Sequence, residues 1–150
     1  MTDPIAIRLA PSAHVDSFAR ESLPPFEDWP VLVGLEGLGY PERLNAAVEL
    51  VEATIAEHGP DRPALLGKDE RWSYGELADV VQRAANVLVS AGVVPGNRVL
   101  LRGPNNPWLA IAWLAVVRAG GVVVTTMPML RAVELEKIAD IARVQFALVD

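Results

Sequence analysis

The sequence predicts an α/β fold: a mostly parallel sheet flanked by helices in three layers, with a β-hairpin and an extended N-terminal leader. Residues 94–150 alternate strand, helix, strand, helix, strand. The run Val122–Thr126 is β-branched and has no polar side, which is typical of a parallel strand covered on both faces. Helices between successive parallel strands imply right-handed crossovers. Because such sheets normally continue, we expect the chain to be an incomplete part of a larger N-terminal domain.

Residues 1–43 are expected to form the leader, and residues 44–150 the first α/β part of the domain. Proline and glycine interrupt the leader repeatedly, so little regular structure is expected there. A short helix is predicted at Ala13–Glu21, with Ser12 as its cap. The leader glycines follow the order G-x-x-G-x-G without a strand-to-helix turn, which argues against a dinucleotide site.

Helical spacing of apolar residues predicts a helix from Leu44 to His58, ended by Gly59-Pro60. Arg62–Gly67 is then expected to be a strand and Arg71-Trp72 the second arm of a hairpin.

The next helix has a complete start signal. Ser73 and Glu76 have the spacing of a capping box, and Trp72 and Leu77 occupy the flanking hydrophobic staple positions. Gly92 is placed to end this helix in a left-handed conformation.

The remaining elements follow in quick succession. Asn97–Arg102 contains a strand, and Asn106 is expected to cap a helix that begins at Pro107 and runs through Ala119. That helix is apolar on every side and is therefore predicted to be buried. After the strand at residues 122–126, we expect a helix near residues 132–142 and a strand at residues 145–149.

Composition excludes several classes of function. The 13 Lys and Arg residues are scattered and the net charge is −6, so nucleic-acid binding is disfavoured. The absence of cysteine excludes disulfides and thiolate chemistry. The first residues lack a secretory signal and the longest apolar run is too short to span a bilayer, so we expect a cytoplasmic protein without a membrane partner.

Several residues invite a functional interpretation, and each also has a structural one. The segment 105–107 opens a helix and could attract a phosphate, but capping explains its residue types. Residues 125–126 are favoured as a strand end, since no Gly-rich loop or lysine follows them. His14 and Asp16 could hydrogen-bond or bind a metal but lack a third ligand, and His58 is at a helix end. Core packing is favoured for Trp72, Trp108 and Trp113, and the role of Trp29 is left open. We therefore assign no catalytic, cofactor-binding or metal-binding residue.

The ordered segments resemble the adenylate-forming enzymes, which include acyl- and aryl-CoA synthetases. Residues 72–77 (WSYGEL) resemble the T/S-Y-x-E-L motif of that superfamily. Residues 113–129 resemble its L-x-A-G-x-x-x-x-P segment, residues 131–134 the helix that follows, and residues 104–106 its P-N-x turn. A closer resemblance, to the benzoate-type CoA ligases and best to the 2-aminobenzoate–CoA ligase branch, extends over residues 13–25, 29–30, 40–50, 94–107 and 126–135.

The resemblance implies an AMP-forming ligase acting in two steps. A carboxylate attacks the α-phosphate of ATP, and the thiol of coenzyme A then displaces AMP. ATP, Mg²⁺ and coenzyme A are thus implied for the parent enzyme, with 2-aminobenzoate or benzoate as the acid. No position of this chain matches the family's phosphate loop, its nucleotide-binding motifs or its catalytic lysine, so we assign none of these roles to its residues. We therefore expect no cofactor in this fragment, and we expect the fragment alone to be inactive.

Two further expectations concern partners. The remainder of the same enzyme would cover this sheet, and without it the exposed apolar surface should drive self-association into a homo-oligomer. The alternative is a stand-alone α/β binding or assembly module without catalysis. A dinucleotide-binding domain is disfavoured because no G-x-G-x-x-G follows a strand.

Overall fold

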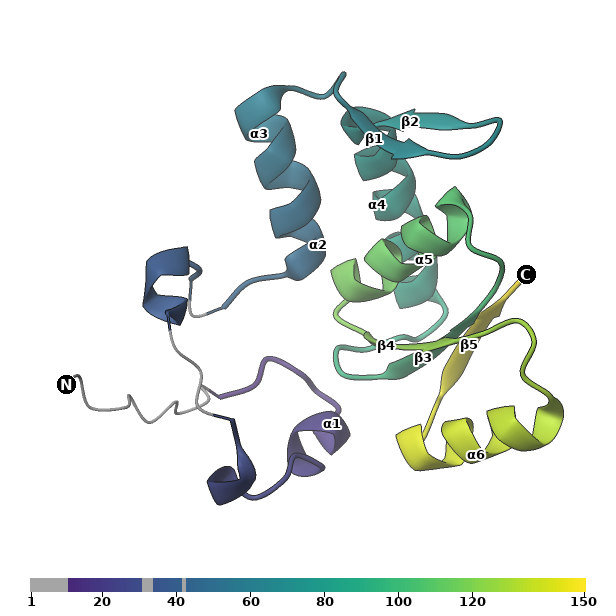
Figure 1. Cartoon of the computed structure of the whole chain (residues 1–150). Helices are drawn as coiled ribbons and strands as arrows, with labels where there is room; N and C mark the ends of the chain where they lie inside the picture. Colours follow the sequence, from purple (N-terminus) through teal and green to yellow (C-terminus); the bar gives the residue numbers. More distant parts are fainter. Residues whose placement is uncertain (1–10, 31–33, 42) are drawn as a thin grey trace.

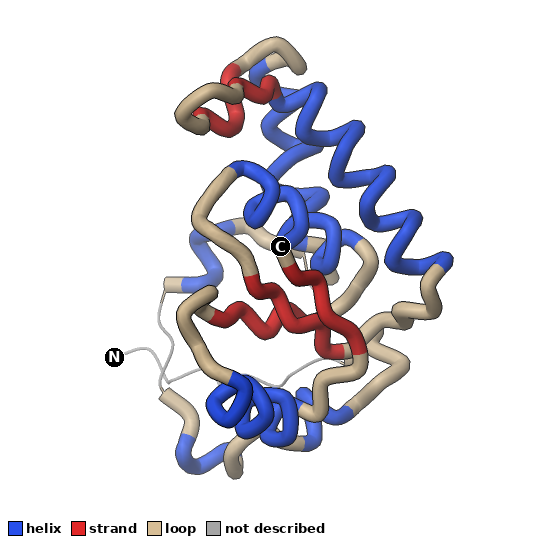
Figure 2. The backbone as a smooth tube through the Cα atoms, turned by 90° about the vertical axis from the view of Figure 1, so that its right-hand side faces the viewer, coloured by secondary structure: helices blue, strands red, loops and turns tan. Residues whose placement is uncertain are grey.

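The α/β prediction is confirmed by the computed structural model, which describes residues 11–30, 34–41 and 43–150. A three-stranded parallel sheet has the order β4-β3-β5, and a separate two-stranded sheet pairs β1 with β2. Helix α5 lies on one face of the parallel sheet and α6 on the other (Figures 1 and 2). Residues 1–10, which contain the start of the predicted leader and the residues considered for a secretory signal, lie outside the described part.

The described part of the leader contains only short helical turns. These are α1 (Phe18–Glu21), the 3-10 turn η1 (Phe26–Asp28) and the 3-10 turn η2 (Leu35–Leu38). The prediction of a helix over residues 13–21 was wrong at its start. Ser12 accepts a hydrogen bond from the His14 amide instead of capping a helix. The chain before residue 18 is held by long-range hydrogen bonds, from the amides of Val15 and Asp16 to the Pro95 carbonyl.

The predicted helix at residues 44–58 forms, but it starts later and is not uniform. It comprises α2 (Ala46–Val48), a π-helical stretch η3 (Glu49–Ala53) and α3 (Thr54–His58). The Asn45 side chain accepts hydrogen bonds from the amides of residues 47 and 48. Residue 44 therefore lies before the cap, a distinction that apolar spacing alone does not make.

The hairpin consists of β1 (Pro63–Leu66) and β2 (Arg71–Ser73), which pair antiparallel. Helix α4 (Tyr74–Ser90) follows directly and shows both hydrogen bonds of the predicted capping box. It ends as predicted, with Gly92 at φ +97°. The amides of residues 92 and 93 donate to the carbonyls of residues 89 and 88, the pattern of a Schellman motif.

The parallel sheet is built from β3 (Arg98–Arg102), β4 (Val122–Thr126) and β5 (Phe146–Val149). Helix α5 (Pro107–Arg118) connects β3 to β4, and α6 (Ala132–Ala142) connects β4 to β5. Strand β3 is central and buried, whereas β4 is half-buried, so the expectation of a strand covered on both faces was wrong for Val122–Thr126. An edge strand made of β-branched residues looks the same in sequence as a central one.

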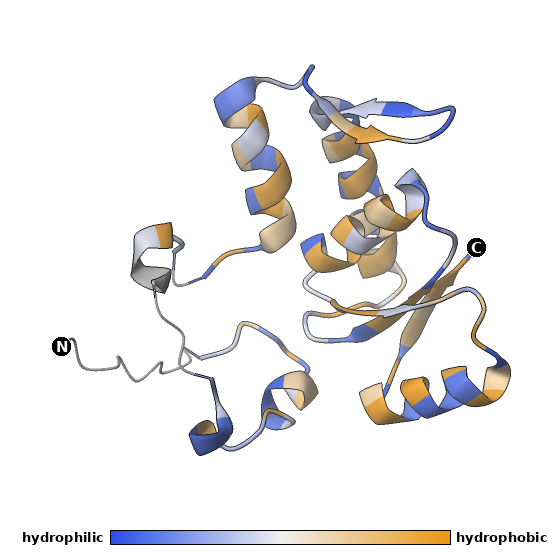
Figure 3. Ribbon diagram, viewed as in Figure 1, coloured by the Kyte–Doolittle hydropathy of each residue, from blue (hydrophilic) through white to orange (hydrophobic). Residues whose placement is uncertain are grey.

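Two clusters form the core. The first lies between α4, α5 and the sheet and includes Val99, Leu101 and Val116. The second joins η3, the hairpin, α4 and α5 around Val81 and Ile111. Much of α5 and of the parallel sheet is apolar (orange in Figure 3), and the buried residues of α4 and α5 belong to these two clusters.

Helix α5 is buried on one face only, which corrects the prediction of an all-round buried helix. Trp108 is 50% exposed and Trp113 is 37% exposed, so neither is a fully buried core residue. Trp72 is half-buried and packs edge-to-face on Trp108, with ring centroids 5.4 Å apart. Trp29 lies in the leader, where its Nε1 donates to the Pro24 carbonyl and its ring contacts Phe26. None of the described helices is both long and apolar enough to cross a bilayer.

Candidate functional site

The strand order places a crevice at the carboxyl edge of the parallel sheet. The chain leaves β3 through α5 to reach β4 on one side, and then returns through α6 to reach β5 on the other side. Connections that diverge in this way leave a gap at the carboxyl ends of the two strands where the direction reverses, and open α/β sheets bind ligands there. A cavity of about 330 Å³ occupies this position, lined by residues 101–104, 106, 108, 109, 112 and 148–150.

The crevice is lined mainly by apolar side chains and by a few polar groups near the ends of β3 and β5. Leu101, Leu109 and Leu148 contribute to the floor. At the rim, the Arg102 carbonyl accepts a hydrogen bond from the Asp150 amide, which fixes the ends of β3 and β5 side by side. This combination of an apolar floor and a few polar groups is typical of small-molecule sites, whose volumes start near ~300 Å³.

Arg102 is one of the polar residues that line the crevice. Its Nη2 donates to the Pro128 carbonyl, at the turn after β4. Its Nε is buried and has no hydrogen-bond partner among the described residues. A buried donor without a partner costs free energy, so this nitrogen is an unfavourable feature of the rim residue as the chain stands.

The residues considered for phosphate binding have structural roles. The Asn106 side chain accepts from the Leu109 amide at 3.0 Å and caps α5, as predicted. The Thr126 hydroxyl is buried and donates to the Leu101 carbonyl at 3.0 Å, which fits the strand-end interpretation. The neighbouring residues Asn105 and Thr125 are exposed.

The histidines do not form a site. His58 lies 3.5 Å from the Glu57 carboxylate at the end of α3, and His14 is exposed in the leader. Across residues 11–30, 34–41 and 43–150, no three His, Asp or Glu side chains are grouped closely enough to hold a metal ion. The described residues also provide no glycine-rich loop with a lysine, so they do not fit Mg²⁺ or the phosphates of a nucleotide.

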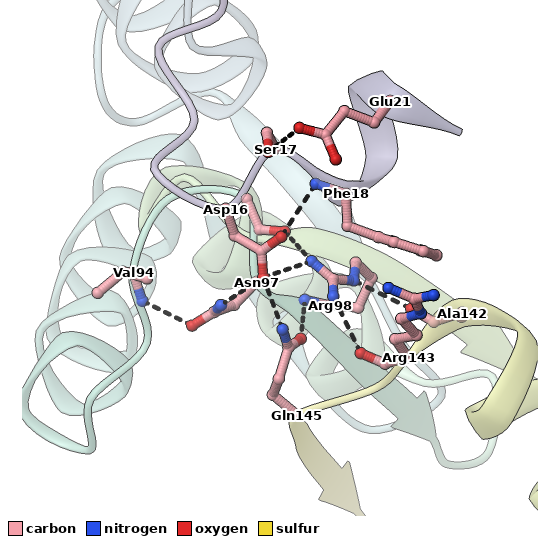
Figure 4. Close-up of polar contacts among 11 residues, drawn as sticks. Asp16, Ser17, Phe18, Glu21, Val94, Asn97, Arg98, Ala142, Arg143 and Gln145 are labelled. Carbon is pink, nitrogen blue, oxygen red and sulfur yellow. Dashed lines mark hydrogen bonds and ion pairs between the residues drawn. The ribbon is translucent and has the colours of Figure 1, made fainter. Parts of the chain in front are cut away.

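The largest polar network lies at the opposite, amino edge of the sheet (Figure 4). Asp16 accepts hydrogen bonds from Asn97 at 3.1 Å and Gln145 at 2.6 Å, and its carboxylate lies 2.7 Å from Nη1 of Arg98. The hydrogen bond from Arg98 and that from the Phe18 amide lower the pKa of Asp16 from about 3.8 to about 2. From its sequence context, only a hydrogen bond or metal binding was expected of Asp16.

One signal in the sequence could have revealed this network. Arg98 stands at the start of the buried strand Val99-Leu100-Leu101, and it is only 4% exposed. A charged side chain at such a position requires a partner, since burying an unpaired charge is costly. The identity of that partner is not visible locally, because Asp16 is 82 positions away in the chain.

Comparison with known proteins identifies the family. A sequence profile described as "AMP-binding enzyme" matches residues 51–150, and the chain belongs to this family. It is 37% identical over 100 residues to a salicyl-AMP ligase / salicyl-S-ArCP synthetase of Mycobacterium tuberculosis, covering 63% of this chain and 18% of the relative. It is 35% identical over 81 residues to a 3-hydroxybenzoate–CoA ligase of Aromatoleum sp. (strain CIB), covering 54% of this chain and 16% of the relative.

Solved structures show the same architecture. Apo MatB from Rhodopseudomonas palustris aligns with a TM-score of 0.64 and 28% identity, over 69% of this chain and 20% of that one. The N-terminal subdomain of Klebsiella oxytoca NpsA aligns with a TM-score of 0.63 and 25% identity, over 69% and 27%. The chain thus spans less than a fifth of the length of the curated relatives named above. The adenylate-forming resemblance is confirmed at the level of the family, and the relatives are varied ligases that do not single out the benzoate or 2-aminobenzoate branch.

Proposed function

We propose that these residues are the N-terminal scaffold of an AMP-forming aryl-CoA ligase that activates benzoate or 2-aminobenzoate. The observation that carries the proposal is the match of residues 51–150 to the AMP-binding enzyme family. The choice of an aromatic acid is supported by two relatives whose names specify hydroxylated benzoates. It is also supported by the resemblance of residues 13–25 and 40–50 to the benzoate-type ligases.

The scaffold would supply shape rather than reacting groups. Strand β3, paired on both sides, holds the carboxyl edge of the sheet in a fixed register. The crevice at that edge is lined by apolar side chains such as Leu101 and Leu109 and by the polar residues Arg102 and Asn106. ATP, Mg²⁺ and coenzyme A would be bound by residues of the enzyme outside this chain, since the donor groups they need are not brought together in its described part.

ATP–pyrophosphate exchange tests the proposal directly. The uninterrupted product of the gene is assayed with benzoate, 2-aminobenzoate, salicylate, 3-hydroxybenzoate and a medium-chain fatty acid, beside the purified 150-residue chain. We expect exchange with benzoate or 2-aminobenzoate from the full product and none from the chain alone. A full product that prefers the fatty acid would overturn the aryl assignment, and exchange by the isolated chain would overturn the scaffold role.

The reading frame separates this proposal from the alternative of a stand-alone module. A continuation of several hundred codons after Asp150 supports the ligase. A stop codon at that point would support a binding or assembly module that shares the family's fold without its chemistry.

A further inference from the structure

Residues 14–18 of the leader, which we call the strap, lie across the amino edge of the parallel sheet. The amides of Val15 and Asp16 both donate to the Pro95 carbonyl, at 2.9 and 3.0 Å. The backbone passes so close to Gly96 that a Cβ there would lie 2.2 Å from the Asp16 carbonyl oxygen. The strap lies before residues 51–150, which match the family profile.

Arg98 connects the strap to the C-terminal part of the chain. Its Nε donates to the Ala142 carbonyl at 3.0 Å and its Nη2 to the Arg143 carbonyl at 3.1 Å, at the end of α6. Its Nη1 donates to the Gly96 carbonyl at 2.8 Å and contacts the Asp16 carboxylate. The guanidinium is therefore held between the strap and the α6–β5 turn (Figure 4).

Two other contacts join the same parts. Gln145 donates from Nε2 to Asp16 and accepts at Oε1 from the Arg98 amide at 2.8 Å. The Phe18 ring lies under two guanidinium groups, 4.6 Å from that of Arg98 and 4.7 Å from that of Arg143. Arg143 has the positive φ of 47° that ends α6, so the backbone there adopts an unfavourable conformation that its surroundings must maintain.

Helix α6 depends on these contacts more than the other long helices do. None of its residues is buried, whereas α4 and α5 contribute several buried residues each. Strand β5 is likewise only half-buried and pairs with one neighbour, β3. Apolar packing therefore stabilises the position of α6 and β5 only weakly, and the polar contacts at the α6–β5 turn contribute more to holding them in place.

We propose that the strap is a lock that holds α6 and β5 against β3, with the Asp16 carboxylate as its key contact. The surface that receives the strap combines the Arg98 guanidinium, the Gln145 amide and the Arg143 guanidinium, and therefore recognises an acidic residue with an aromatic residue two positions later. Residues 16–18 of the same chain supply this chemistry. Release of the strap loosens β5, whose far end lines the crevice.

Hydrogen exchange of the full 150-residue chain, read by mass spectrometry, tests the lock. Asp16→Asn keeps the shape of the side chain and removes its charge. We expect exchange at residues 15–16 and at the β5 amides to rise by about tenfold or more, while amides of α4 exchange as in the wild type. Asp28→Asn is the matched control, because it makes the same charge change in the leader at an exposed residue away from the strap and should alter neither segment.

Two outcomes overturn the proposal. Unchanged exchange at residues 15–16 shows that the carboxylate does not hold the strap, and faster exchange there with unchanged β5 shows that the strap does not lock the strand. If Asp16→Asn fails to fold, Phe18→Leu replaces it. It keeps the carboxylate and removes the ring between the guanidinium groups, and it must accelerate exchange at both residues 15–16 and β5 for the proposal to stand.

Discussion

Two glycines with nearly the same positive φ allow the contribution of the strap to stability to be isolated. Gly92 has φ +97° and Gly96 has φ +93°. A Cβ at Gly92 meets no atom within 4 Å, whereas at Gly96 it would lie 2.2 Å from the Asp16 carbonyl oxygen and 2.9 Å from the His14 Cβ. Alanine at either position therefore has a similar backbone penalty, and only alanine at position 96 collides with the strap.

The two costs can be estimated separately. A left-handed conformation costs an L-residue about 1–2 kcal/mol, and this applies to both Gly92→Ala and Gly96→Ala. The reduced entropy of the unfolded chain offsets both by the same ~0.4–1 kcal/mol. At position 96 the obstructing atom belongs to the backbone, so the strap must move. The two hydrogen bonds from the strap amides to the Pro95 carbonyl are then lost. At about 0.5–1.5 kcal/mol each, these bonds make Gly96→Ala about 1–3 kcal/mol more destabilising than Gly92→Ala.

Urea unfolding followed by tryptophan fluorescence measures the difference. We expect both variants to unfold with similar m-values, and the midpoint of Gly96→Ala to lie below that of Gly92→Ala. Equal free energies of unfolding for the two variants would refute the close approach of the strap to Gly96.

Four further predictions address the core, the cap, the ionised strap and the surface. Leu101 is 1% exposed in the central strand, and Leu101→Ala should lower the free energy of unfolding by about 3–5 kcal/mol. Leu66 is 69% exposed, and Leu66→Ala should change it by less than ~0.5 kcal/mol. Urea midpoints check both variants, and similar losses would contradict the assignment of the core. Ser73→Ala removes the acceptor for the Glu76 amide and should lower the free energy of unfolding by about 1 kcal/mol in the same assay. An unchanged urea midpoint would contradict the role of Ser73 as a cap. Because the pKa of Asp16 is lowered to about 2, the stabilisation that its carboxylate provides is present above its ordinary pKa and disappears as the pH falls from about 5 towards 2. The urea midpoints of the wild type and Asp16→Asn should therefore converge over that range. A difference between them that does not change with pH would count against the ionised contact. Exposed apolar side chains such as Met129 and Val133, at 83% and 77%, should drive the chain into a dimer or larger species, and a monomer by light scattering at high concentration would contradict this.

Local signals in the sequence predicted the helix starts and ends well. The capping box at Ser73 and Glu76, the Asn106 cap and the glycine end of α4 each depend on residues fewer than six positions apart. Such contacts form within one turn of chain, so the residue types at those positions are sufficient to specify them. The helix predicted at residues 13–21 failed where the local signal competed with contacts to Pro95 and Gly96.

Burial was predicted less well, because it depends on the neighbours an element finds. Strand β4 is β-branched throughout and helix α5 is apolar on every side, yet β4 is an edge strand and α5 presents Trp108 and Trp113 to solvent. An apolar sequence shows that an element can tolerate burial, and the packing of other elements decides which of its faces is covered.

The sequence by itself determined the fold class, the order of the elements, the caps and the family, since these depend on local periodicity and on short motifs. Only the tertiary structure decided the strand order, the crevice between the ends of β3 and β5, and the strap across the amino edge. The Asp16–Gln145 contact joins residues 129 positions apart, and hydrogen bonds of that range have no signature in the residues next to either partner. They exist because the buried guanidinium of Arg98 requires a counter-charge, and the folded sheet brings the leader within its reach.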